Sequence, residues 1–125
     1  MYQVIIVDDE PRILEGIIHL FPWNNFGFEV VASFTNGKEA LEYINAHPQV
    51  DVVMTDIQMP VMNGYDSTRH IRALERPDIK SMPIIAMSAN AFAEDIKLCK
   101  ESGMNEHIAK PIDFGKVLEI LEKYL

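Results

Sequence analysis

The sequence is poor in cysteine, with Cys99 as its single thiol among 125 residues. A lone cysteine cannot form an internal disulfide, and without a neighbouring cysteine it completes no redox motif. Long hydrophobic runs are missing as well, and none approaches the roughly 18 to 20 residues that cross a bilayer. The apolar opening segment is interrupted by Asp8, Asp9 and Glu10, which disfavours a secretory leader. We therefore expect a cytoplasmic domain that makes no membrane contact itself, although a longer parent chain could supply an anchor.

Positive charge is scarce, because eleven Lys and Arg stand against nineteen Asp and Glu and give a net charge of −8. Such a surface repels phosphate backbones and anionic lipids, so we expect no direct nucleic-acid binding. The remaining composition, with 48% hydrophobic and 24% charged residues, is that of a globular protein. A chain of this length buries about two-thirds of its unfolded surface. We expect residues 1–125 to form one domain, either alone or as part of a longer chain.

Short apolar segments alternate with segments of helical periodicity. The apolar segments are continuous and rich in β-branched residues, which is typical of a parallel sheet with helices on both faces. Strands are expected at 4–7, 30–32, 52–54, 84–87 and 107–109. Helices are expected from Pro11, after a cap at Asn36, over Tyr65–Leu74 and Phe92–Ser102, and from Asp113. A turn at Pro60, Asn63 and Gly64 is expected before the third helix. This alternation predicts an α/β fold of five βα units with right-handed crossovers.

Polar residues follow most of the predicted strands. Asp8 and Asp9 end the first strand, Asp56 the third, Ser88 the fourth and Lys110 the fifth. In open parallel sheets, ligands bind beyond the carboxyl ends of the strands, where the strand order reverses. In a sheet of order 2-1-3-4-5 the first and third strands are neighbours, and all five side chains would meet at one edge.

Carboxylates placed this close need a counter-charge, because each close pair repels by about 4 kcal/mol at an effective dielectric near 20. Hard oxygen ligands without histidine or thiolate favour Mg²⁺, or Mn²⁺ in its place. Such a site suits phosphoryl chemistry, with Lys110 as a second positive charge and the Ser88 hydroxyl as a hydrogen-bond donor. Asp56 would be the nucleophile, and its attack on phosphorus would give an aspartyl-phosphate.

Four segments together resemble a known family. They are Ile5-Ile6-Val7-Asp8-Asp9-Glu10, Asp56-Ile57-Gln58-Met59-Pro60-Val61-Met62-Asn63-Gly64, Ala86-Met87-Ser88-Ala89 and Lys110-Pro111. In this order and spacing the sequence resembles the receiver domain of two-component response regulators and hybrid sensor histidine kinases. The resemblance spans nearly all of the chain. It implies a CheY-like, flavodoxin-like (βα)5 sandwich with a parallel five-stranded sheet in order 2-1-3-4-5.

The resemblance also implies a role for each matching residue near the phosphoacceptor. Asp56 would accept phosphate from the phosphohistidine of a histidine kinase or histidine phosphotransfer domain. Asp9, Asp56 and the Gln58 main-chain carbonyl would ligate Mg²⁺, with Asp8 acting through water. Lys110 would contact the phosphoryl group. The resemblance implies a signalling domain that assists only its own phosphorylation and dephosphorylation, rather than an enzyme.

A second set of residues is implied to carry the switch. Ser88 would be the switch hydroxyl, Ala89 the small residue beside the phosphate, and Pro111 would form a cis peptide bond with Lys110. His107 departs from the family pattern, because a tyrosine or phenylalanine usually occupies its position. Phosphorylation would alter the surface of the last two helices and the strand between them. Gln58 and Asn90 stand at positions that tune the phosphoryl lifetime.

Two kinds of parent protein are suggested by different parts of the chain. The segments 64–66, 84–92 and 103–107 resemble receivers of hybrid kinases, which we place ahead. The segments 21–23 and 27–31 are similar to transcriptional regulators that carry an AraC-type DNA-binding domain. No charge pattern commits the chain to a dimer, so a monomer is the expectation and the oligomeric state stays open.

The leading alternative is a pseudo-receiver that binds partners constitutively without phosphorylation. A flavodoxin-like electron carrier or nucleotide enzyme is disfavoured because no glycine-rich phosphate loop follows the first strand. A haloacid-dehalogenase-type phosphatase would need an acid at Gln58. Structurally, Asp8 and Asp9 could merely cap a helix, and Trp23 is expected to be a packing residue far from Asp56.

Overall fold

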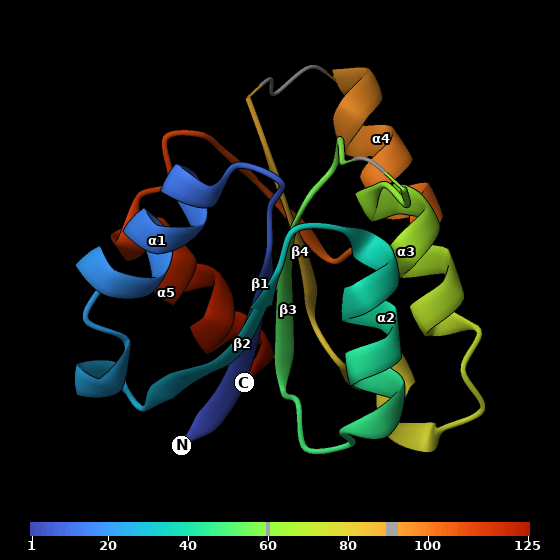
Figure 1. Cartoon of the computed structure of the whole chain (residues 1–125), viewed down its shortest axis with the longest axis horizontal. Helices are drawn as coiled ribbons and strands as arrows, with labels where there is room; N and C mark the ends of the chain where they lie inside the picture. The colour runs from blue at the N-terminus through green and yellow to red at the C-terminus, as the bar shows by residue number, and fades with distance from the viewer. Residues whose placement is uncertain (60, 90–92) are drawn as a thin grey trace.

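The computed structural model describes residues 1–59, 61–89 and 93–125. A parallel sheet of five strands runs in the order β2-β1-β3-β4-β5, as predicted. The strands are β1 (Tyr2–Val7), β2 (Phe28–Phe34), β3 (Val52–Asp56), β4 (Ile84–Ser88) and β5 (Glu106–Ala109). The helices are α1 (Pro11–Leu20), α2 (Gly37–Ala46), α3 (Gly64–Arg72), α4 (Ala93–Ser102) and α5 (Phe114–Tyr124), with 3₁₀ turns η1 (Trp23–Phe26) and η2 (Pro77–Ser81). Helices α1 and α5 cover one face of the sheet, and α2, α3 and α4 cover the other (Figure 1).

The core forms on both faces of the sheet because consecutive strand residues point in opposite directions. Ile5 and Val53 pack with α2, α3 and α4, whereas their neighbours Ile6 and Met54 pack with α1 and α5. All four side chains are almost completely buried. This two-sided burial is the reason that the strands are continuously apolar in the sequence, and it confirms the predicted three-layer α/β fold.

Three helices begin at side-chain caps that satisfy otherwise unpaired backbone N–H groups. The Asn36 side chain accepts a hydrogen bond from Glu39 N at 3.0 Å, and Asp113 accepts one from Gly115 N at 3.1 Å. Asn63 caps α3 by accepting from Asp66 N at 2.9 Å. The predicted cap at Asn36 is therefore confirmed, and Asp113, predicted to begin the last helix, is the cap that precedes it.

Several boundaries differ from the prediction. Strand β2 is longer than the expected 30–32, because pairing with β1 extends it from Phe28 to Phe34, and β5 begins one residue early at Glu106. Neither 3₁₀ turn was predicted. Pro60, Asn90 and the expected helix start at Phe92 lie outside the described residues. Trp23 is buried and donates its indole N–H to Ile17 O at 2.8 Å, as expected of a packing residue.

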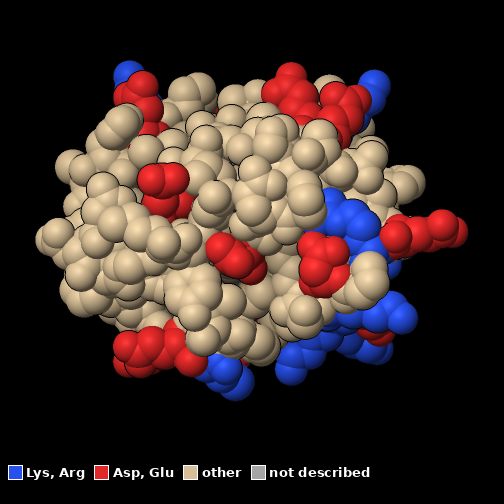
Figure 2. All heavy atoms as spheres, turned by 90° about the horizontal axis from the view of Figure 1, so that it is seen from below, with Lys and Arg blue, Asp and Glu red and all other residues tan. Residues whose placement is uncertain are grey.

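Within the described residues, none of the helices combines the length and the apolar character that crossing a bilayer would require. Charge is distributed unevenly over the surface. Figure 2 views the end of the molecule where β1 begins, and there Lys and Arg side chains gather along one edge while acidic side chains are scattered. The acidic cluster described next lies at the opposite end, beyond the carboxyl ends of the strands.

Candidate functional site

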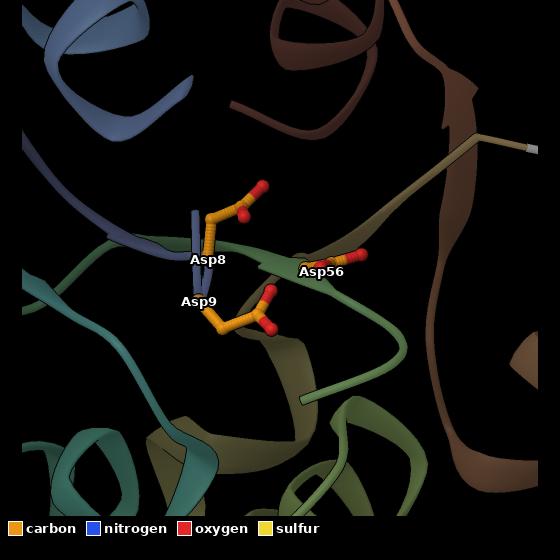
Figure 3. A group of neighbouring side chains, drawn as sticks. All are labelled: Asp8, Asp9 and Asp56. Carbon is orange, nitrogen blue, oxygen red and sulfur yellow. The ribbon is translucent and has the colours of Figure 1, made fainter. Parts of the chain in front are cut away.

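Three aspartates meet beyond the carboxyl ends of β1 and β3. Asp8 and Asp9 directly follow β1, and Asp56 is the last residue of β3. These two strands are neighbours, with Val7 paired to Thr55, so the chain leaves both strands at the same level. One oxygen from each carboxylate lies within 4.8 Å of the others (Figure 3). Asp8 and Asp56 are buried and Asp9 is exposed, so the cluster opens to solvent on one side.

The acidic pair does not cap the helix that follows it. The residue preceding α1 is Glu10, and it makes no side-chain capping bond. Asp8 Oδ1 instead accepts a hydrogen bond from Glu10 N at 2.9 Å, which leaves its other oxygen directed into the cluster. The alternative in which Asp8 and Asp9 serve only as a helix cap is therefore wrong.

Lys110 brings positive charge to the cluster from the end of β5. Its Nζ atom lies 2.8 Å from Asp8 Oδ2 and 3.5 Å from Asp56 Oδ1. Its backbone N–H donates to Ser88 O at 2.7 Å, which ties the lysine to β4, and its peptide bond to Pro111 is cis. Burial alone would lower the pKa of Lys110, but the contacts with Asp8 and Asp56 outweigh burial and raise it. Lys110 is therefore a firmly protonated cation.

Asp56 is held in a fixed orientation and in an unfavourable electrostatic environment. Its Oδ1 atom accepts a hydrogen bond from Ile57 N at 2.9 Å. Burial and then the negative charge of Asp8 raise the pKa of Asp56 to about 6, although Lys110 and the Ile57 N–H act in the opposite direction. Among the described residues, the Lys110 ammonium pairs with two of the three clustered carboxylates, those of Asp8 and Asp56. The donor set of this site therefore fits an additional hard cation.

A cavity of about 190 Å³ opens beside this cluster. It is lined by Asp56, Ile57, Gln58, Ser88, Ala89, Asp95 and Lys110. The structure thus brings together at one pocket five residues that the sequence analysis singled out. Asp95 was not among them, because an acid in the first turn of a helix is typical helix chemistry and carries no sequence signal for a pocket.

The backbone of Gly64 packs directly against the backbone of Asp56 and Ile57. Gly64 N donates to Ile57 O at 2.7 Å, and a Cβ atom at Gly64 would clash with the carbonyl oxygen of Asp56. Only glycine permits this contact, because real Cβ atoms do not approach an oxygen so closely. The sequence marked Gly64 as a turn residue, but its packing against Asp56 required the folded structure.

His107 reaches the edge of the site from β5. Its Nε2 atom lies 2.6 Å from Ser88 Oγ, and both side chains are partly buried. The predicted switch pair is therefore in direct contact.

An apolar groove of about 590 Å³ runs beside the pocket, between α1 and the segment after β5. It is lined by Ile13, Gly16, Ile17, Leu20, Phe21, Ala89, Lys110, Pro111 and Ile112. Ala89 and Lys110 line both the groove and the acidic pocket, so the two are adjacent. Leu20 is 80% exposed at the rim of this groove.

The site and the fold together define a doubly wound α/β domain with an acidic pocket and a lysine at the switch-point edge of its sheet. Comparison with known proteins identifies the family, since residues 4–122 match the response regulator receiver domain. The chain belongs to this family, which functions in two-component signalling and shares the CheY-like fold.

Relatives with longer chains contain this domain. The chain is 35% identical to hybrid signal transduction histidine kinase L of Dictyostelium discoideum over 98% of its own length but 7% of that protein. It is 32% identical to the transcriptional regulatory protein HptR of Staphylococcus aureus over 97% of its length and 45% of that protein. The chain therefore spans less than half the length of either relative. One of these relatives is a hybrid histidine kinase and the other a transcriptional regulatory protein.

Solved structures agree with the fold. The CheX–CheY–BeF3–Mg complex of Borrelia burgdorferi contains a chain that superposes with a TM-score of 0.85 at 28% identity, covering 99% of this chain and 90% of that one. The receiver domain of the sensor histidine kinase PA1611 of Pseudomonas aeruginosa, solved with magnesium in its active-site cleft, gives 0.82 at 29% identity, covering 98% and 96%.

Proposed function

We propose that this receiver domain is a phosphoacceptor in which Asp56 takes a phosphoryl group from a phosphohistidine of a histidine kinase or histidine phosphotransfer domain. The observation that carries the proposal is the placement of Asp56. Its carboxylate lines an open pocket, is oriented by Ile57 N, and lies 3.5 Å from the Lys110 ammonium. Such transfers occur in the cytoplasm, where we place this domain.

In the proposed reaction an oxygen of Asp56 forms a bond to phosphorus while the phosphorus–nitrogen bond of the donor breaks and the imidazole leaves. Lys110 stabilises the negative charge on the phosphoryl oxygens, since its ammonium already lies in the pocket. The Ser88 hydroxyl, on the same pocket wall, donates a hydrogen bond to a phosphoryl oxygen. Ala89 leaves room beside the phosphoryl group because its side chain ends at Cβ.

We infer that the acidic cluster holds Mg²⁺, or Mn²⁺ in its place, through Asp9, Asp56 and the Gln58 main-chain carbonyl, with Asp8 acting through water. The supporting observation is the surplus of negative charge among three carboxylates that lie within 4.8 Å of one another. When bound, the cation supplies positive charge that offsets repulsion between the carboxylate and the incoming phosphoryl oxygens.

The apolar groove is the surface that we propose for the donor domain. A donor must bring its histidine to Asp56, and the groove adjoins the pocket through Ala89 and Lys110. Replacing Leu20 by Asp should lower the rate of transfer from a phosphorylated histidine kinase about tenfold or more, as truncation of an interface anchor typically does. Labelling by acetyl phosphate should not change, because this small donor does not use the groove. Equal loss with both donors would contradict the assignment of the groove.

Mass spectrometry of the intact protein tests the phosphoacceptor. After incubation with acetyl phosphate and Mg²⁺, the wild-type chain should gain one phosphate, and Asp56→Asn should gain none. Omission of Mg²⁺ should abolish the gain. Equal labelling of Asp56→Asn would refute the assignment. A wild-type chain that is labelled neither by acetyl phosphate nor by a phosphorylated kinase, and that does not bind Mg²⁺, would instead support a pseudo-receiver that binds its partners constitutively.

On phosphorylation we propose that the surface formed by α4, β5 and α5 changes and is read by a partner. The supporting observation is the contact between Ser88 on the pocket wall and His107 on β5. Bonding of Ser88 to the phosphoryl group biases an existing equilibrium of this surface rather than creating a new fold. The domain then acts as a signalling switch that assists only its own phosphorylation and dephosphorylation.

A further inference from the structure

The loop between β3 and α3 directly follows Asp56 and adjoins the acidic cluster. It includes Gln58, whose main-chain carbonyl we infer to be a ligand of the cation. Ile57 N donates to Met87 O at 3.3 Å, and Gly64 N donates to Ile57 O at 2.7 Å. The second of these bonds closes the loop on itself, so a displacement of one arm of the loop is passed to the other.

A hydrogen bond from α2 fixes the second arm of this loop. Gly37, the first residue of α2, donates its N–H to Met62 O at 3.1 Å. This N–H is available because the first N–H groups of a helix have no partner within the helix, and the Asn36 cap accepts from Glu39 N instead. Among the described residues, no other backbone hydrogen bond joins 61–63 to an element outside α3.

The space beside the Cα atom of Gly37 is already occupied. A Cβ atom there would lie 2.6 Å from Met62 O and 2.8 Å from Ser67 Cβ, which is closer than real Cβ atoms approach. Ser67 of α3 also donates its hydroxyl to Gly37 O at 3.2 Å, so α3 holds Gly37 from the other side. Helices α2 and α3 lie side by side on one face of the sheet (Figure 1). Any side chain at position 37 would therefore push Met62 away from α2.

The residue before Met62 shows that this part of the loop is constrained. Val61 has a φ of 70°, which β-branched residues rarely adopt. Such a conformation persists only where the surrounding structure fixes the chain. The bond from Gly37 supplies one fixed point, and the burial of Met59 in the core beneath α2 and α3 supplies another. Loss of the contact with Gly37 should therefore let the loop relax to a different shape.

We propose that Gly37 is a positioning residue for the cation site. Through its N–H and the absence of a side chain, Gly37 holds the Met62 arm of the loop, and the closed loop then presents the Gln58 carbonyl to the carboxylates of Asp9 and Asp56. This inference rests on the proposed function, in which those three groups hold Mg²⁺. It goes beyond that function because it makes cation affinity depend on α2, a helix that contributes no ligand.

Calorimetric titration with Mg²⁺ tests this role. For Gly37→Ala, we expect the dissociation constant for Mg²⁺ to rise about 10- to 100-fold above that of wild type, the loss that is typical when a group that orients a metal ligand is removed. Circular dichroism shows beforehand whether the variant is folded. An unchanged dissociation constant in a folded variant would overturn the proposal.

Val117→Ala separates positioning from a general loss of stability. Val117 of α5 is completely buried against the opposite face of the sheet, and its truncation leaves a cavity there. This variant should be less stable than wild type and bind Mg²⁺ equally well. A loss of affinity equal to that of Gly37→Ala would show that destabilisation alone weakens binding, and would overturn the proposal. A wild type that binds no Mg²⁺ would refute the proposed cation site, and this inference with it.

Hydrogen exchange of the Gly37 amide, measured by NMR, tests the same coupling without any substitution. Coupling is reciprocal, so if the contact between Gly37 and Met62 favours the cation, the cation favours that contact by the same factor. Mg²⁺ should therefore slow exchange of the Gly37 amide about tenfold or more. The amide of His47, which donates to Ile44 O at the other end of α2, should change little. If bound Mg²⁺ leaves exchange at Gly37 unchanged, the proposal is wrong, even where Gly37→Ala does not fold.

Discussion

Under the proposed function, Asp56 must meet two opposing requirements. It must be ionised to attack phosphorus, yet its burial and the charge of Asp8 favour the protonated form and raise its pKa to about 6. The positive charge of Lys110 lowers the pKa of Asp56, but by less than burial and Asp8 raise it. Without a bound cation, the ionised Asp56 carboxylate therefore destabilises the folded domain.

This conflict predicts how stability depends on pH. The pKa of Asp56 rises from its ordinary value of 3.8 to about 6 on folding, so the native state binds more protons than the unfolded state between these values. Stability should therefore fall as the pH rises through about 4 to 6. In metal-free buffer, Asp56→Asn should raise the free energy of unfolding by about 1 to 3 kcal/mol at pH 7.5 and by much less near pH 4.

Urea denaturation at several pH values measures this difference. Asp66→Asn is a matched control, because Asp66 is exposed and its ion pair with Arg69 lies at the surface. That variant should change stability little at any pH. The prediction would be contradicted if the increase in the free energy of unfolding caused by Asp56→Asn became larger as the pH fell.

Single residues at strand ends were the most predictable part of the site. Asp8, Asp56 and Lys110 were singled out from the sequence because a polar residue that closes an apolar run lies at the ligand-binding edge of a parallel sheet. The contribution of Asp95 to the pocket depends instead on how α4 packs, which no local pattern encodes.

At the scale of elements, hydrogen bonds from the Arg72 side chain connect α3 to two other segments, η2 and the turn before β5. Its guanidinium donates to the backbone carbonyls of Gly103 at 3.0 Å and Met82 at 2.8 Å, and also to that of Ile79. It further donates to Asn105 Oδ1 at 2.8 Å. The planar fork of arginine thereby connects α3 to η2 and to the turn before β5.

Removing this guanidinium should be costly. Arg72→Met leaves several partly buried acceptors without a donor, and we expect the free energy of unfolding to fall by about 3 to 5 kcal/mol. Arg69→Met, on the same helix but at the surface, should cost at most about 1 kcal/mol. Chemical denaturation of both variants measures the contrast. Equal effects would show that the Arg72 contacts contribute no more than a surface ion pair.

The loop between β3 and α3 contains a strained residue. Val61 has a φ of 70°, the left-handed region that β-branched residues rarely adopt, and its side chain is 80% exposed. Val61→Asn should therefore raise the free energy of unfolding by about 1 kcal/mol, because asparagine tolerates this conformation and little packing is lost. Val61→Ala keeps most of the backbone strain, so it should raise the free energy of unfolding by less than Val61→Asn does. Thermal unfolding compares the two, and destabilisation by Asn would contradict the argument.

At the scale of the whole molecule, cation binding should be coupled to folding. A ligand that binds only the native state at about 100 times its dissociation constant stabilises it by about 2.7 kcal/mol. Mg²⁺ should therefore raise the midpoint of thermal unfolding by several degrees, and NaCl of equal ionic strength should raise it less. Asp9→Asn should remove most of the extra rise in this midpoint that Mg²⁺ gives over NaCl. An identical response to both salts would count against a specific site.

The sequence by itself determined the class of fold, the strand order through the family resemblance, and the strand-end residues that form the acidic site. These follow from local signals, since continuous apolar runs and capping residues reflect the environment of the same segment. The tertiary structure alone decided the entry of Asp95 into the pocket, the approach of Gly64 to Asp56 and the bond between Ser88 and His107. Each depends on distances between segments far apart in the chain, which arise only when the sheet and its helices pack together.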